Sequence, residues 1–179
     1  MPGICGICIF THLISARYIG HNWCPRKYIL QPEITRGGGL FKHFGGASLD
    51  KNTGHGTHVV GTILGDGSSD SEAKGLASGS SMHFQALEHD NTGFFGRQGS
   101  LYDMLRDFYT AGSRTGSNSW GAPGAQGEYT SDSRSVDTFA NDYDDFTVLF
   151  AAGESNVGIA APSTAKNALS IGAATSERP

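Results

Sequence analysis

Two histidines separated by two residues are the side chains whose type and spacing most directly suggest chemistry. They lie in the stretch Asn52-Thr53-Gly54-His55-Gly56-Thr57-His58-Val59-Val60-Gly61-Thr62. A histidine suits general-base work because its unperturbed pKa lies near neutral pH. Histidines three apart also suggest a metal site, but the zinc helix of metallopeptidases spaces them four apart around a glutamate. The intervening residues here supply no carboxylate, so the pattern favours a general base over metal ligands or two purely structural histidines.

The element that must position His55 is a short helix, expected over residues 53–64. Four apolar side chains, Val59, Val60, Ile63 and Leu64, are spread around most of its circumference. A helix that is apolar on nearly every side is normally buried. We therefore expect His55 at the edge of a core, with His58 packed on the next turn.

The rest of the chain alternates between apolar strands and amphipathic helices. The apolar periods predict strands over 81–87, 114–120, 147–152 and 168–173, and helices over 100–112 and 131–144. Strands that are apolar on both faces and alternate with helices favour a mostly parallel sheet in a three-layer α/β fold. Ligand sites in such sheets form at the carboxyl ends of strands.

The histidine stretch resembles the histidine motif of the subtilases, the subtilisin-like serine peptidases. Further likeness lies in Asn118-Ser119-Trp120-Gly121, in Phe150-Ala151-Ala152-Gly153, and in the run from Ala161 to Ala173. The amino-acid sequence of these segments most resembles that of the alkaline, oxidatively stable subtilases. The resemblance, which covers about residues 50–179, implies an incomplete subtilisin-like fold, a serine endopeptidase function, and His55 as the base of the catalytic triad.

The resemblance also implies a substrate-binding site built from two strand ends. Ser119, Trp120 and Gly121 would form one wall, and Ala151, Ala152 and Gly153 the other. The physical basis is strand addition, in which an extended peptide satisfies exposed backbone groups while a pocket takes one side chain. A Trp between Ser and Gly is also compatible with a plain core position.

Three departures from the family pattern concern the catalytic groups. The triad aspartate is expected in an Asp-Ser/Thr-Gly turn upstream of the histidine, but the only upstream aspartate is Asp50, in the approach to the helix. The nucleophile motif Gly-Thr-Ser-Met-Ala-x-Pro does not occur in the sequence. Glu154 occupies the position of the asparagine that donates to the oxyanion, and a carboxylate there repels negative charge. We therefore expect a fragment of a peptidase domain that is inactive by itself, or alternatively a non-catalytic peptide-binding remnant.

Composition narrows the remaining choices. With a net charge of -4 and no apolar run of about 18 residues, the 179-residue chain suits neither nucleic-acid binding nor a membrane span. Peptides or proteins are the expected partners, and the compartment is unassigned because residues 1–32 make a poor signal sequence. All three cysteines, Cys5, Cys8 and Cys24, lie in that segment.

We divide the chain into an unassigned leader, 1–32, and a partial peptidase domain, 33–179, with residues 32–51 expected as loop. Free thiols are favoured over zinc or redox chemistry for Cys5-x-x-Cys8, because a second cysteine pair and a βαβ context are lacking. No cofactor or metal is expected. Calcium suits the intact family domain, but the loop 65–71 lacks the carboxylate spacing of a calcium loop.

Overall fold

The computed structural model describes residues 6–11, 40–43, 55–68, 70–87, 99–153 and 158–174. Its main sheet has six strands in the order β2-β3-β1-β4-β6-β8, and every neighbouring pair is parallel. The strands are β1 (Gly6–Thr11), β2 (Leu40–His43), β3 (Ser81–Ala86), β4 (Ser113–Ser119), β6 (Thr147–Ala151) and β8 (Leu169–Ile171). Two further strands, β5 (Ala122–Gln126) and β7 (Ala160–Ala161), form a separate antiparallel pair.

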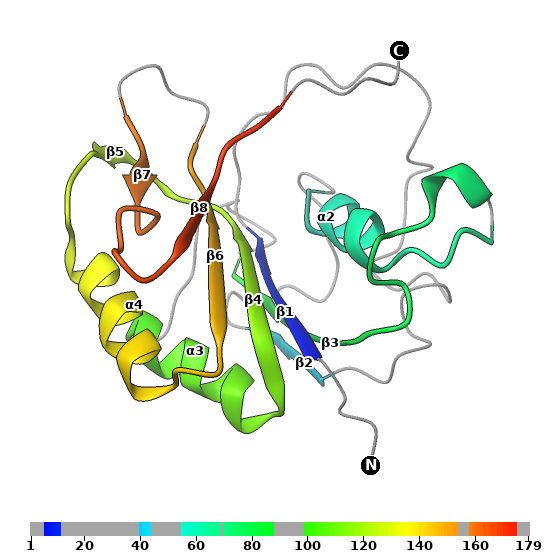
Figure 1. Ribbon diagram of the computed structural model, residues 1–179, viewed down its shortest axis with the longest axis horizontal. Helices are drawn as coiled ribbons and strands as arrows, with labels where there is room; N and C mark the ends of the chain where they lie inside the picture. Colours follow the sequence, from blue (N-terminus) through cyan, green and yellow to red (C-terminus); the bar gives the residue numbers. More distant parts are fainter. Residues whose placement is uncertain are drawn as a thin grey trace.

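Helices cover both faces of the sheet, as predicted for a three-layer fold. The helices α3 (Leu101–Thr110) and α4 (Ser131–Asp142) lie together on one face, and α2 (His55–Leu64) lies on the other (Figure 1). A short 3-10 helix, η1 (Ser71–Ala73), follows α2. Within β3, Met82 and Phe84 pack against α2, whereas the Gln85 Nε2 donates to the Met104 carbonyl of α3 at 3.3 Å. This alternation shows that β3 is buried on both faces.

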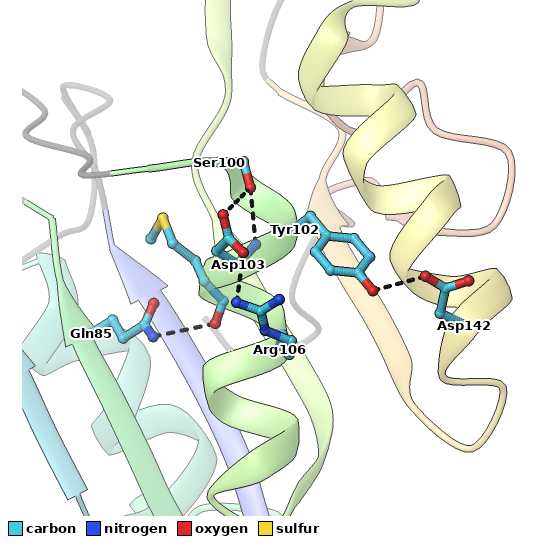
Figure 2. Close-up of polar contacts among 7 residues, drawn as sticks. Gln85, Ser100, Tyr102, Asp103, Arg106 and Asp142 are labelled. Atoms are coloured by element: carbon cyan, nitrogen blue, oxygen red, sulfur yellow. Dashed lines mark hydrogen bonds and ion pairs between the residues drawn. The ribbon is translucent and has the colours of Figure 1, made fainter.

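The ends of α3 follow directly from its sequence. Ser100 is the N-cap, and its Oγ accepts a hydrogen bond from the Asp103 N–H at 3.1 Å (Figure 2). An N-cap of this kind satisfies one of the donors that a helix leaves free at its start. The backbone of Gly112, just beyond the helix, has a φ of 102°, which favours glycine. The predicted helix over 100–112 is confirmed, with its caps included in that range.

The packing of α4 on α3 forms the larger of the two apolar cores. Phe139 is fully buried and meets Tyr102 and Phe146 edge to face, at centroid distances of 5.9 and 5.1 Å. The Tyr102 hydroxyl donates to Asp142 at 2.8 Å, which ties the two helices together at the surface (Figure 2). The helix predicted over 131–144 ends two residues early, with Tyr143 as its C-cap.

Two strands fall where the sequence predicted none. Gly6–Thr11, in the segment that we left unassigned, is a central strand between β3 and β4. Leu40–His43 pairs with β3 at the sheet edge, where we expected only loop. Both are short, and only β1 is mostly apolar, so strand pairing with distant residues rather than local sequence stabilises them.

The opposite edge of the sheet also differs from expectation. The strand predicted over 168–173 is only three residues long, and its side chains are exposed, with Leu169 at 53% and Ile171 at 50%. These residues are apolar as predicted, but β8 is the last strand in the sheet order and has β6 on one side only. Among the described residues, no helix is long and apolar enough to cross a membrane.

Candidate functional site

The helix predicted over 53–64 is described from His55 onwards. His55 is the first residue of α2, and residues 53 and 54 lie outside the described part of the chain. The helix packs against β1, whose final residue, Thr11, is in register with Ser119 of β4. His55 therefore belongs to a helix that packs on β1, and β1 is the neighbour of β4, one of the two predicted substrate strands.

The environment of α2 is less enclosed than predicted. Val60 and Leu64 are buried against β3, but His58 and Thr62 are exposed. The Thr62 hydroxyl donates to the His58 carbonyl at 3.0 Å, one turn back along the same face. The prediction that His58 is packed is therefore wrong, because positions 58 and 62 form a polar stripe on the helix.

The carboxyl end of α2 is fastened by the segment that follows it. The N–H groups of Gly75 and Ala77 donate to the carbonyls of Gly65 and Ile63, both at 2.8 Å. A Cβ on Gly75 would lie 2.6 Å from the Ile63 backbone, so only glycine fits here. This close approach fixes the far end of the helix that carries His55.

The acidic residues of the loop after α2 serve local backbone bonds. Asp66 accepts from the Ser68 N–H at 2.8 Å, and Asp70 accepts from the Glu72 N–H at 2.9 Å. Such turns are typical of aspartate in loops. Among the described residues, no group of three His, Cys, Asp or Glu side chains is arranged to hold a metal ion.

The two predicted substrate strands end side by side. β4 and β6 are parallel neighbours, with Asn118 in register with Phe150, so Ser119 and Ala151 follow at the same edge. The buried Asn118 side chain also donates to the Leu149 carbonyl at 2.9 Å. The predicted adjacency of these strand ends is confirmed, and they lie at the top of Figure 1, close to β5 and β7.

Beyond the strand ends, the two predicted walls meet at one alanine. The Ala160 N–H donates to the Ala152 carbonyl at 3.0 Å. A Cβ on Gly121 would lie 2.9 Å from the Ala160 Cβ, and one on Gly153 would lie 3.5 Å from it. The Gly153 φ of 97° independently favours glycine. Ala160 therefore occupies the space between the backbones of the two segments.

The Trp120 side chain belongs to the core. Its indole is 5% exposed and meets the Phe150 ring edge to face at 5.3 Å. This contact anchors the end of β4 to β6 and leaves the backbone of residues 119–121 as the part that can face a ligand. A role of Trp120 in the predicted wall is thus limited to its main chain.

Glu154, predicted at the oxyanion position, lies outside the described residues, as does Asp50, which we did not assign to the triad. In the sequence, the strand β1 upstream of the histidine is followed by His12 and Leu13, without the Asp-Ser/Thr-Gly turn of the family. The assignments of His55 and Glu154 therefore stay predictions.

A serine and a histidine that sequence reasoning did not pair are hydrogen-bonded across the sheet. His83 Nδ1 lies 2.7 Å from the Ser113 Oγ, and partial burial lowers the pKa of His83. Ser113 is the first residue of β4, so it lies at the amino end of the strand, whereas the candidate site lies at the carboxyl end. Ser113 also has no exposed surface. The pair is a structural bond rather than a second nucleophile.

Comparison with known proteins agrees with the histidine motif and the sheet. The profile of the subtilase family matches residues 42–178. Two similar proteins from Dictyostelium discoideum are the serine protease/ABC transporter B family proteins tagB and tagD. They are 33% and 35% identical over 133 and 130 residues, or 69% and 67% of this chain. The chain spans only 7% of the length of either relative.

Two solved structures share the fold. The psychrophilic subtilisin-like protease Apa1 from Pseudoalteromonas sp. AS-11 aligns with 94% of this chain and 36% of its own, at a TM-score of 0.64 and 17% identity. The prenylagaramide maturation protease PagA aligns with 93% of this chain and 52% of its own, at 0.61 and 14%. The narrower likeness to alkaline subtilases stays a prediction. By the family profile, the histidine motif and the fold, this chain belongs to the subtilase family.

Proposed function

We propose that this chain carries the histidine and the substrate-binding strands of a serine endopeptidase. His55 would take the proton of the nucleophilic serine and return it to the leaving amine, while an aspartate orients its ring. An extended peptide would lie against the backbones of residues 119–121 and 151–153. The observation that carries the proposal is the pairing of β4 with β6, which brings these two segments to one edge beside the strand that α2 covers.

Residues 1–179 alone should not hydrolyse peptides. The sequence lacks the family motif that supplies the serine, and Asp50 is only five positions from His55. Ser119 and Ser163 are no substitutes, because a nucleophile must lie about 3 Å from its base. Ser163 is also 3% exposed and donates to the Ser170 hydroxyl at 2.6 Å. For the endopeptidase function, the serine and the aspartate would have to be supplied by other sequence.

We further propose that Glu154 lowers the catalytic rate of the peptidase domain. A carboxylate offers no hydrogen-bond donor to the oxyanion and repels it electrostatically. In a subtilisin, loss of the asparagine donor costs about 100- to 1,000-fold in kcat, and we take that magnitude from the relative directly. Glu154→Asn in a completed domain should therefore raise kcat by about that factor and change KM little, because the oxyanion forms only after attack.

A chimaera tests the proposal by supplying the missing groups. Residues 42–178 replace the matching segment of the Apa1 protease, and hydrolysis of a fluorogenic peptide is measured with Glu154 and with Glu154→Asn. We expect hydrolysis that His55→Ala reduces by at least about a thousand-fold. His58→Ala, which changes an exposed histidine of the same helix, is the matched control and should retain activity. Equal activity of the two alanine variants in a folded chimaera would overturn the role of His55.

The alternative function is a non-catalytic peptide-binding remnant. The observation that favours it is that the two strand ends are assembled although no nucleophile motif is present. Both functions use the same backbone segments, so saturable peptide binding without hydrolysis by residues 1–179 is expected in either case. They separate in the chimaera, because a remnant that has lost the catalytic geometry stays inactive even with Glu154→Asn.

A further inference from the structure

A connecting segment, residues 158–168, links the outer helix α4 to the predicted substrate walls. We name it the strap. Its first part contains β7, which pairs with β5 through Ala161 and Ala122. The Ile159 carbonyl accepts from the Gly127 N–H at 2.7 Å. Ala160 and Ala161 are 7% and 1% exposed. The strap thus places Ala160 beside Gly121 and Gly153: a Cβ on Gly121 would lie only 2.9 Å from the Ala160 Cβ, whereas one on Gly153 would lie at an ordinary contact distance of 3.5 Å.

The second part of the strap is held from α4 by side-chain hydrogen bonds. The Thr164 hydroxyl lies 2.8 Å from the Ser133 hydroxyl and donates to the Glu128 carbonyl at 2.7 Å. Three residues further on, the Asn167 N–H donates to Asp137 Oδ1, also at 2.7 Å. The strap is therefore fastened at Thr164 and Asn167 to α4 and to the residues just before it.

Asp137 is the hub of this attachment. Its Oδ2 accepts from the Tyr129 hydroxyl at 2.7 Å while its Oδ1 holds Asn167, so each oxygen binds a different segment. Partial burial by itself raises the pKa of Asp137. The hydrogen bonds from Tyr129 and from the backbones of Asn167 and Lys166, with the nearby Lys166 charge, outweigh this and lower the pKa overall. A charged acceptor makes these bonds stronger than neutral ones.

We propose that Asp137 is a positioning residue for substrate: by holding Asn167 it fixes the strap, and the strap sets Ala160 between the two substrate walls. Asp137 itself lies on the outer helix and touches neither wall. The last step, that the walls bind substrate, rests on the proposed function. The first step, that Asp137 controls the position of Ala160, stands on the geometry alone.

Amide hydrogen exchange, measured by NMR on residues 1–179, tests the first step. Asp137→Ala should raise the exchange of the Ala160 and Asn167 amides by about ten-fold or more, the scale expected for losing a hydrogen bond to a charged group. Asp137→Asn keeps an acceptor for the Asn167 N–H, so its exchange rates should lie between those of the wild-type chain and of Asp137→Ala. Asp144→Ala removes the same charge from an exposed turn and is the matched control. Faster exchange at Asn167 with no change at Ala160 would overturn the proposal.

Two further variants keep the test decisive. If Asp137→Ala does not fold, Asp137→Asn and Tyr129→Phe are compared instead. The first removes the charge of Asp137 and the second removes the hydrogen bond from Tyr129, but both keep a side-chain acceptor for the Asn167 N–H. Titration with N-acetyl-Ala-Ala-Ala-Phe-amide tests the last step, and we expect Asp137→Ala to bind about ten-fold more weakly than Asp144→Ala. Unchanged affinity would overturn the substrate role of Asp137. No saturable binding to the wild-type chain would overturn the proposed function itself, while the exchange rates still decide the role of the hub.

Discussion

The tight contact between Gly121 and Ala160 yields the sharpest prediction about the candidate site. An alanine at position 121 would place its Cβ 2.9 Å from the Ala160 Cβ, closer than real Cβ atoms approach, and 3.4 Å from the Ala161 carbonyl oxygen. The Gly121 backbone has no positive φ, so this contact rather than strain decides the outcome. Overpacking of this kind costs about 1–3 kcal/mol in the free energy of unfolding.

Removing the opposing methyl group should relieve the clash. Ala160→Gly alone should cost about 1–2 kcal/mol, from one lost buried methyl and the added freedom of glycine. The double variant moves a methyl from one side of the contact to the other, so it should be no less stable than Ala160→Gly alone. The double-mutant cycle should then show a favourable coupling of about 1–3 kcal/mol, equal to the cost of Gly121→Ala that it removes.

Urea unfolding of the four proteins measures this coupling. With a slope near 2 kcal/mol per molar urea, Gly121→Ala should lower the midpoint by about 0.5–1.5 M. Gly124→Ala is the matched control, because Gly124 lies in the adjoining β5 with nothing within 4 Å of a new Cβ. We expect that control to change stability by less than about 0.5 kcal/mol. A Gly121→Ala cost no larger than that of Gly124→Ala, or additive effects in the cycle, would refute the placement of Ala160.

Four other predictions concern the scaffold. Phe139→Ala should destabilise the chain by about 3–5 kcal/mol in urea unfolding, because it empties the fully buried centre of the α3–α4 core. Ser100→Ala should cost about 1 kcal/mol in the same assay through loss of the N-cap. The hydrogen bond to Asp142 raises the pKa of Tyr102 from 10.0 to about 12, so stability present below pH 10 should decline as pH rises towards 12. Tyr102→Phe should remove that decline, and an unchanged alkaline profile would contradict the assignment. Burial lowers the pKa of His83 from 6.5, so stability present above pH 6.5 should fall as the pH drops below it, a dependence that His83→Gln should abolish.

The elements whose apolar residues recur at helical or strand spacing were predictable from the sequence. Leu101, Leu105 and Phe108 recur at helical spacing, and all are buried in α3. The adjacency of the β4 and β6 ends followed from the resemblance, because the substrate pocket that it implies requires the two ends to lie side by side. The histidine motif predicted a helix over 53–64, which contains α2, but it did not reveal that His58 is exposed.

Other features depend on partners far away in sequence. The run Gly6–Thr11 is a strand because β3 and β4 flank it, and a short, mostly apolar run alone does not indicate which element it forms. The strand β5 contains Pro123 and Gly124, which local rules place in loops. Asp137 gave no local signal, since its acceptor role is defined by Asn167, thirty positions further on.

Labelling with a fluorophosphonate probe tests the central claim most directly. The probe reacts with a serine made nucleophilic by a neighbouring base, so it reports on the assembled site rather than on family membership. Soluble residues 1–179 are treated beside the intact Apa1 protease as a positive control. We expect Apa1 to be labelled and this chain to remain unlabelled. Stoichiometric labelling of any serine in this chain, abolished by His55→Ala, would contradict it.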